Sequence, residues 1–272
     1  LSESQQKAFD KYLKGENVFI TGPGGTGKSH FIENVYENAK KRGLKVSVTA
    51  MTGCAALLLD CNAKTIHSWG SIGLGTDPIE VIMKRIVKYR KRDAWLNTDL
   101  LIIDEVSMLS CELFELLYRI AQDFRRNTKP FGNMQIIFSG DFHQLPPVSK
   151  DSKFCFESPF WNDCFENQIV LCENFRQKDD NTYQKVLNEI REGNITQESK
   201  DILRSCLNKK PNDQISPTLL YPVKRLAEQL NLFENISLEG EEKVYKMKYI
   251  DTPNKKVEDE LIKQKKNLIV DE

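Results

Sequence analysis

An octapeptide near the N-terminus constrains the fold of this chain more than any other feature of its sequence. Residues 22–29, Gly-Pro-Gly-Gly-Thr-Gly-Lys-Ser, match the pattern G-x-x-x-x-G-K-S/T at every position. An apolar run at 18–20 precedes the motif, and apolar residues follow it at helical spacing: Phe31, Ile32, Val35 and Ala39. This order predicts a strand, a phosphate-binding loop (P-loop) and a helix, because glycines let successive N–H groups turn inward and the helix N-terminus adds positive charge.

The last two residues of the motif carry its chemistry. Lys28 is expected to reach the β- and γ-phosphates of a nucleotide, and Ser29 is expected to hold Mg²⁺. The alternative is a glycine-rich turn with no ligand, and the strand and helix patterns on either side disfavour it.

A second predicted strand, 99–103, ends in two acidic residues, Asp104 and Glu105. Two unpaired carboxylates at a buried strand end are costly unless a cation or a reacting water uses them. Asp104 therefore suits the Mg²⁺ shell, and Glu105 suits a base that activates water for attack on the γ-phosphate. In isolation the pair could equally cap the next helix, but beside a complete P-loop the catalytic interpretation is favoured.

A third strand end leads into Gly140-Asp-Phe-His-Gln144-Leu-Pro-Pro147. Gln144 could contact the γ-phosphate and report its loss. The residues alone leave open a glutamine that is only solvated.

The pattern of the whole chain predicts an α/β fold in which helices cover both faces of a parallel sheet. Expected strands are 17–21, 45–50, 99–103 and 134–139, and weaker candidates lie at 169–171 and 218–221, with helical patterns at 180–192 and 196–207. Ligands bind beyond the carboxyl ends of parallel strands, so the polar residues should gather at one edge. A chain of 272 residues suits two modest domains. We expect an ATP-binding domain over 1–172 with a small insertion around 70–98, the start of a second domain over 173–235, and an incomplete segment over 236–272.

The insertion contains a predicted amphipathic helix that Asp77 caps and Pro78 begins. Its basic residues share the face opposite the apolar one: Lys84, Arg85, Lys88, Lys91 and Arg92. Either this face is simply solvated, or it contacts a phosphate backbone.

Composition excludes several classes of protein. The 39 basic and 39 acidic residues cancel, which argues against a protein that coats nucleic acid by bulk charge. Seven cysteines without a C-x-x-C pair, and three histidines, argue against a disulfide framework and a structural zinc site. No apolar run is long enough to span a membrane and no signal peptide is evident, so the sequence predicts a soluble intracellular protein without a membrane partner.

Seven motifs in this order resemble the petite-integration-frequency DNA helicases, which belong to the superfamily-one branch that moves 5′ to 3′ and has RecD-like relatives. The resemblance spans about residues 1–235. The motifs are 1–5 (Leu-Ser-Glu-Ser-Gln), 22–29, 49–56, 65–69, 102–108, 140–147 and 174–177 (Asn-Phe-Arg-Gln). It implies two RecA-like domains with ATP between them, single-stranded and forked or structured DNA as partners, and a monomeric helicase.

The resemblance also implies roles for single residues. Gln5 would read adenine, Gln144 would couple hydrolysis to movement, and Arg176 would be the arginine finger. The implied nucleotide-binding set is Gln5, Gly22, Gly24, Gly25, Thr26, Gly27, Lys28, Ser29 and His30. The implied DNA-contacting set is Thr52, Gly53, Thr65, His67, Trp69 and Pro146. Taken alone, His67 and Trp69 are as readily core residues, although a tryptophan could stack on a base.

The sequence departs from this family after 219–222, because neither a T-x-H-K-x-Q-G string nor a second arginine-bearing motif follows. The chain is therefore expected to lack part of the second domain. Other functions stay open, namely a DNA-stimulated ATPase clamp or loader without unwinding activity, or another P-loop hydrolase or kinase. A switch GTPase is disfavoured because no N-K-x-D guanine-binding motif is present.

Overall fold

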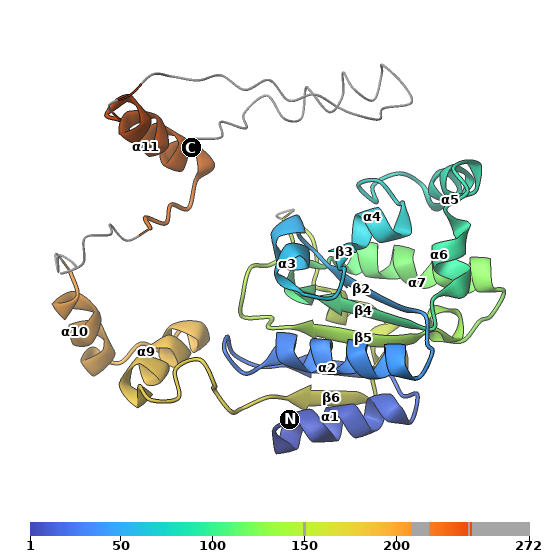
Figure 1. The fold of residues 1–272 in the computed structure, drawn as a ribbon, viewed down its shortest axis with the longest axis horizontal. Helices are drawn as coiled ribbons and strands as arrows, with labels where there is room; N and C mark the ends of the chain where they lie inside the picture. Colours follow the sequence, from blue (N-terminus) through green and yellow to red (C-terminus); the bar gives the residue numbers. More distant parts are fainter. Residues whose placement is uncertain (149–150, 208–217, 239, 241–272) are drawn as a thin grey trace. The chain divides into compact units, whose positions relative to one another are not determined.

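The computed structural model describes residues 1–148, 151–207, 218–238 and 240 (Figure 1). The chain divides into two compact units, Leu1–Leu207 and Asn208–Glu272. Helix α11 (Lys224–Ile236) belongs to the second unit. The division predicted after residue 172 falls inside the first unit and stays a prediction, as does the second RecA-like domain. Most of the predicted segment 236–272 lies outside the described residues.

The first unit is built on a six-stranded sheet in which every pairing is parallel, with the order β3-β2-β4-β5-β1-β6. The strands are β1 (Val18–Thr21), β2 (Val46–Ala50), β3 (Lys64–Thr65), β4 (Leu100–Asp104), β5 (Gln135–Gly140) and β6 (Asn167–Val170). The parallel α/β fold is therefore confirmed, with strands at the four main expected positions and at 169–171.

Helices lie between the strands, as parallel connections require. Along the chain they are α1 (Glu3–Leu13), α2 (Lys28–Lys41), α3 (Gly53–Leu58), α4 (Ile66–Gly70), α5 (Ile79–Lys88), α6 (Arg92–Asn97), α7 (Cys111–Arg125), α8 (Trp161–Cys164), α9 (Asn181–Glu192) and α10 (Gln197–Ser205). Short 3₁₀ helices occupy Val106–Met108, Pro130–Asn133 and Cys155–Glu157. None of the helices in the described part of the chain is long and apolar enough to cross a membrane.

Two apolar layers sandwich the sheet because successive side chains of a strand point to opposite faces. In β4, Leu100 and Ile102 pack on one side with α1 and α2, while Leu101 and Ile103 pack on the other with α7. Figure 1 shows α1 and α2 running along one face. The buried strands leave only their carboxyl ends for polar chemistry, which is where the motifs lie.

The insertion packs against α7 through a buried tryptophan, Trp95, whose ring centroid lies 6.3 Å from that of Phe124. Trp95 is fully buried and donates from Nε1 to the Gly70 carbonyl oxygen at 3.0 Å. The prediction that Asp77 caps α5 is wrong, because Pro78 is the N-cap residue and makes no side-chain cap. The Asp77 carboxylate instead pairs with Arg85, at 2.9 Å between Oδ2 and Nη1.

One expected strand does not form, and one observed strand was not predicted. Residues 218–221 form no strand, so the weak apolar run there was wrongly interpreted. No sequence pattern predicts β3, which has two residues and pairs Thr65 with Ala50 of β2. A strand of this length is too short to produce an alternating pattern.

Candidate nucleotide-binding site

The P-loop joins the end of β1 to the start of α2, as the motif predicts. Gly25 and Gly27 have φ values of +87° and +80°, a region that glycine enters without steric cost. A Cβ atom on Gly22 would collide with the carbonyl oxygen of Leu171, which follows β6. The glycines are therefore required by both backbone conformation and close packing.

The loop presents its backbone donors to a ligand. Within the described residues, no hydrogen bond to a protein acceptor occupies the backbone amides of residues 24–29. An inward-turned row of free amides at a helix N-terminus is the cradle that a phosphate group needs. The loop residues thus fit the phosphates of a nucleotide.

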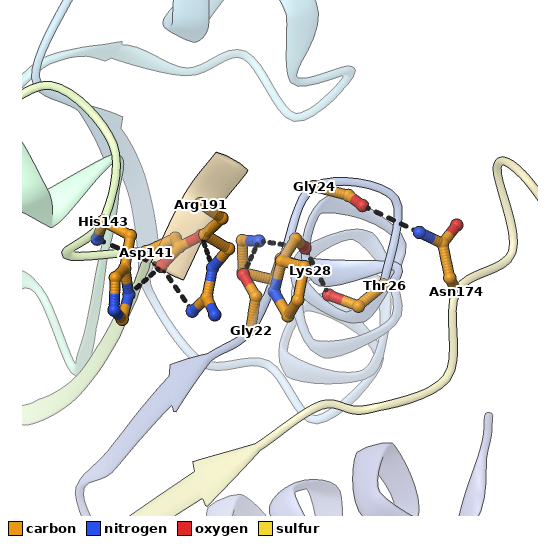
Figure 2. Close-up of polar contacts among 9 residues, drawn as sticks. Gly22, Gly24, Thr26, Lys28, Asp141, His143, Asn174 and Arg191 are labelled. Carbon is orange, nitrogen blue, oxygen red and sulfur yellow. Dashed lines mark hydrogen bonds and ion pairs between the residues drawn. The ribbon is translucent and has the colours of Figure 1, made fainter. Parts of the chain in front are cut away.

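Lys28 lies folded over this loop (Figure 2). Its Nζ donates to the carbonyl oxygens of Gly22 at 2.7 Å and Pro23 at 3.0 Å. Burial lowers the pKa of Lys28, and the negative charges of Asp141, Asp104 and Glu105 oppose that shift. Carbonyl oxygens are weaker partners for an ammonium than phosphate oxygens, so a bound phosphate can draw Lys28 away from them.

Asp104 and Glu105 lie together at the carboxyl end of β4. Asp104 is 6% exposed, and no ion pair within the described residues engages either carboxylate. Burial raises the pKa of both groups, and the neighbouring Asp104 raises the pKa of Glu105 further. Glu105 has a left-handed backbone, with φ 58° and ψ 42°, which is uncommon for a residue other than glycine. Unpaired acids held in this way are typical of sites that receive a cation or a proton.

The donor set fits Mg²⁺ only in company with a nucleotide. Ser29 is the second residue of α2 and Asp104 ends β4, and both offer the oxygen ligands that Mg²⁺ prefers. The part of the chain that the structure describes contains no cluster of three or more His, Cys, Asp or Glu residues able to hold a metal. The remaining ligands would have to be phosphate oxygens and water.

Gln5, on α1, contacts the backbone of the P-loop. Its Nε2 donates to the carbonyl oxygens of Thr26 at 3.3 Å and Gly27 at 3.2 Å, while its Oε1 accepts from the Ser2 amide in a capping box. The side chain is 2% exposed. In this arrangement Gln5 supports the loop backbone, and adenine reading by this residue stays a prediction.

The segment 174–177 lies on the other side of the loop. The Phe175 amide donates to the Gly25 carbonyl oxygen at 2.8 Å, and Asn174 Nδ2 donates to the Gly24 carbonyl oxygen at 3.3 Å. A Cβ atom on Gly25 would come within 2.8 Å of the Arg176 Cβ atom. Arg176 itself is exposed. The first unit therefore already places Arg176 beside the loop, and its role as the arginine finger stays a prediction.

The strand end at β5 holds a residue that the sequence did not single out. Asp141 is 1% exposed and forms two hydrogen bonds with the guanidinium of Arg191 from α9 (Figure 2). Burial alone would raise the pKa of Asp141, but the Arg191 guanidinium holds it below its usual value. Gln144, the predicted coupling residue, is exposed three positions later. An acid directly after a buried strand was the available signal for Asp141; Arg191 had none, because its partner is 50 residues away.

The predicted DNA-contacting residues fall into three groups. Thr52 and Thr65 are the N-cap residues of α3 and α4, with Gly53 exposed beside the first cap. His67 is half-buried, which lowers its pKa, and Pro146 is exposed.

Trp69 forms the third group. It is 9% exposed and packs on Trp95 with ring centroids 4.7 Å apart. This is the core position that the sequence left open, and the packing does not support stacking of Trp69 on a base.

The basic face of α5 is only partly available. Arg85 is engaged by Asp77 and by the Ile72 carbonyl oxygen, and the Arg92 guanidinium lies 5.6 Å from the centre of the Phe124 ring. Lys84 and Lys88 are exposed. Lys91, the N-cap residue of α6, is exposed as well, so the predicted basic face has three exposed lysines available for a phosphate backbone.

Comparison with known proteins was made on sequence and on structure. A family model described as PIF1-like helicase matches residues 1–201. The ATP-dependent DNA helicase PIF1 of Saccharomyces cerevisiae is 38% identical over 256 residues, which cover 90% of this chain and 29% of that protein. The ATP-dependent DNA helicase RRM3 of the same species is 37% identical over 262 residues, covering 92% of this chain and 35% of the relative. The chain thus spans about a third of the length of these curated relatives.

Solved structures agree with this match. The crystal structure of Pif1 helicase from Candida albicans superposes with a TM-score of 0.82 at 35% identity, covering 89% of this chain and 55% of that one. Pif1 helicase from Bacteroides in complex with ADP-AlF3 and ssDNA gives a TM-score of 0.76 at 28% identity, covering 89% and 58%. These matches confirm the RecA-like sheet. Because the family model matches residues 1–201, which is more than half of the chain, this chain belongs to the PIF1-like helicase family.

Proposed function

We propose that this chain carries the ATP-hydrolysing part of a DNA helicase that couples hydrolysis of MgATP to 5′-to-3′ movement along single-stranded DNA. The main support is one juxtaposition: the P-loop with its free amides and the carboxylates Asp104 and Glu105 lie at the same carboxyl edge of the sheet, where the two acids act on the charge of Lys28. A phosphate cradle beside an acid that can accept a proton suits attack of water on a γ-phosphate. The names and ligands of the similar Pif1 proteins support DNA as the partner.

In this proposal each residue has a separate task. The loop amides and Lys28 bind the β- and γ-phosphates, while Glu105 takes a proton from the attacking water. Arg176 stabilises the charge that develops on the departing phosphate. Ser29 and Asp104 would hold Mg²⁺, which neutralises phosphate charge when bound. Gln144 would couple loss of the γ-phosphate to movement along the strand.

The proposal is tested by measuring ATP hydrolysis with and without single-stranded DNA, and unwinding of forks that carry a 5′ or a 3′ tail. We expect DNA to stimulate hydrolysis by this chain, and a 5′ tail to support unwinding by a protein that contains the whole second domain. Stimulation without unwinding on either fork would favour a DNA-stimulated ATPase clamp. Hydrolysis that ignores DNA would instead favour another P-loop hydrolase. Forked DNA as substrate and a monomeric state belong to the same proposal, and sedimentation with and without DNA checks the second.

Lys28→Ala is expected to abolish ATP turnover while leaving the fold intact. The substitution removes the charge on the β- and γ-phosphates, and loss of one electrostatic contact in a reaction site typically costs about 10²- to 10³-fold in kcat. The Lys28 ammonium contacts only loop carbonyl oxygens here, so the melting temperature should change little. Near-normal turnover by the variant would show that the measured activity does not arise at this loop.

Lys84→Glu combined with Lys88→Glu is expected to weaken binding of single-stranded DNA. Each lost phosphate contact flattens the dependence of log K on log salt by about 0.7, so two contacts would change the slope by about 1.4. The matched control is Lys41→Glu with Lys45→Glu, two exposed lysines at the amino end of the sheet that give the same change in net charge. Equal slopes for both double variants would show that the basic face of α5 is only solvated.

A further inference from the structure

An ion pair between Asp141 and Arg191 joins the sheet to helix α9 beside the nucleotide site. Arg191 Nε donates to Asp141 Oδ2 at 2.7 Å, and Nη2 donates to Oδ1 at 2.8 Å. The two side chains are 1% and 21% exposed respectively. His143 adds a backbone amide donor at 3.2 Å to the same carboxylate. Two parallel bonds from a guanidinium fix both the distance and the orientation of their partner.

This pair dominates the attachment of α9. Val186 is the buried residue of the helix, so little apolar surface holds it to its surroundings. Without Arg191 the buried carboxylate would keep only the His143 amide and ring nitrogen as partners, at 3.2 and 3.3 Å, among the described residues. Removing the guanidinium is therefore costly, because water cannot reach the carboxylate to compensate. The last turn of α9, which contains Arg191, is therefore held firmly at the carboxyl end of β5.

The first turn of α9 is tied to the segment that lies on the P-loop. Asp180 caps the helix by accepting from the Tyr183 amide at 2.8 Å, and Gln184 Nε2 donates to the Gln177 carbonyl oxygen. Two residues before Gln177, the Phe175 amide donates to Gly25 of the P-loop. An unbroken series of contacts thus runs from Asp141 through α9 to the loop.

We propose that Arg191 is a positioning residue for the nucleotide site: by anchoring α9 to Asp141, it holds the segment 174–177 on the P-loop and so places Arg176. The role of Arg176 in hydrolysis rests on the proposed function, whereas the anchoring itself does not. Figure 2 shows both ends of this arrangement, with Arg191 at Asp141 and Asn174 at Gly24. Arg191 needs no contact with the nucleotide to affect its hydrolysis.

A different role for Arg191 would be to neutralise Asp141 and so keep that carboxylate from competing for Lys28. The two roles differ in what removing the carboxylate does. If neutralisation were the function, Asp141→Asn would restore activity to Arg191→Gln, because no charge would remain to neutralise. If Arg191 anchors α9, the variant with both Asp141→Asn and Arg191→Gln has activity as low as Arg191→Gln alone, because the contact between α9 and β5 is still missing.

The anchoring is tested without nucleotide by hydrogen exchange at the Phe175 amide, followed by NMR. In Arg191→Gln we expect this amide to exchange at least about tenfold faster, since a buried charge pair that held the segment has gone. The Ile102 amide in the central strand β4 reports on global folding and should keep its protection. In Arg191→Lys the exchange rate at Phe175 should lie between those of the wild type and Arg191→Gln. An ammonium keeps the positive charge but cannot form the two parallel hydrogen bonds of the guanidinium.

The matched control is Arg204→Gln, the same substitution in an exposed ion pair with Asp201 on α10. It should leave exchange at Phe175 unchanged. Unchanged exchange at Phe175 in Arg191→Gln would overturn the proposal. A loss of protection at Phe175 that the control reproduces would overturn it as well.

Steady-state kinetics then test the link to Arg176. Arg191→Gln should lower kcat for ATP hydrolysis while the Kd for ATP is maintained, and adding Arg176→Ala should lower kcat no further than Arg176→Ala alone. If the two substitutions lower kcat independently, so that the double variant shows the product of the two single effects, Arg191 does not act by placing Arg176. If the wild-type chain hydrolyses no ATP, the proposed function fails, while the exchange experiment still decides the anchoring.

Discussion

Replacing Arg176 with alanine is expected to lower kcat for ATP hydrolysis by about 10³- to 10⁵-fold, the range that an arginine finger supplies in phosphoryl transfer. The Arg176 backbone lies against Gly25 of the P-loop, and its exposed side chain lies beside the loop that is proposed to hold the phosphates. The guanidinium meets charge that develops only in the transition state, so ATP affinity should change far less than kcat. Single-turnover hydrolysis together with a fluorescent-nucleotide titration separates the two quantities.

The control is Arg204→Ala, which removes an exposed guanidinium from α10 and should leave both quantities unchanged. A surface salt bridge is worth under about 1 kcal/mol, which corresponds to a change of less than about fivefold. An effect of that size for Arg176→Ala would mean that the arginine makes an ordinary surface contact and that the charge is stabilised elsewhere.

Glu105→Gln is expected to retain nucleotide binding and to lose hydrolysis by about 10²- to 10⁴-fold, the usual contribution of a general base. Glutamine keeps the size and hydrogen-bonding reach of the side chain but cannot accept a proton. The left-handed backbone at this position burdens both residues alike, so the fold should be preserved. Measuring ATP affinity and the hydrolysis rate on the same preparation tests the assignment.

Two further variants sharpen this experiment. Glu112→Gln changes an exposed acid on α7 and should have no effect. Asp104→Asn should instead raise the Mg²⁺ concentration needed for hydrolysis, because it removes a charged ligand. Normal hydrolysis by Glu105→Gln would mean that another group accepts the proton from water. Asp104 would then be the next residue to test as the general base.

The sheet and the phosphate-binding site could be predicted because their signals are local. The apolar run of β4 and the acids after it occupy six consecutive residues, and the P-loop with its flanking strand and helix is continuous in sequence. Burial on both faces makes such strands uniformly apolar, and the chemistry follows at their ends. These features need no knowledge of which strand pairs with which.

The features that were predicted wrongly or missed depend instead on contacts that form only in the folded chain. Asp77 looks like a cap in sequence, but its carboxylate pairs with Arg85 on the second turn of α5. Trp69 has an aromatic ring that could stack on a base, and only the packing of the insertion places that ring on Trp95. The Arg191 partner of Asp141 belongs to the same class, because no local pattern connects residues that meet through the tertiary fold.

The order of the strands determines when the nucleotide site can form during synthesis. Strand β1, which carries the P-loop, pairs with β5 and β6, so that Val18 lies opposite Ile137 and Asn167. Its partners leave the ribosome long after β1 itself, at a pace of about 5 to 20 residues each second. During that interval β1 is an apolar segment with unpaired backbone groups, which is a target for chaperones and for aggregation. Nucleotide can stabilise the nascent chain only after β6 has emerged and closed the sheet around β1.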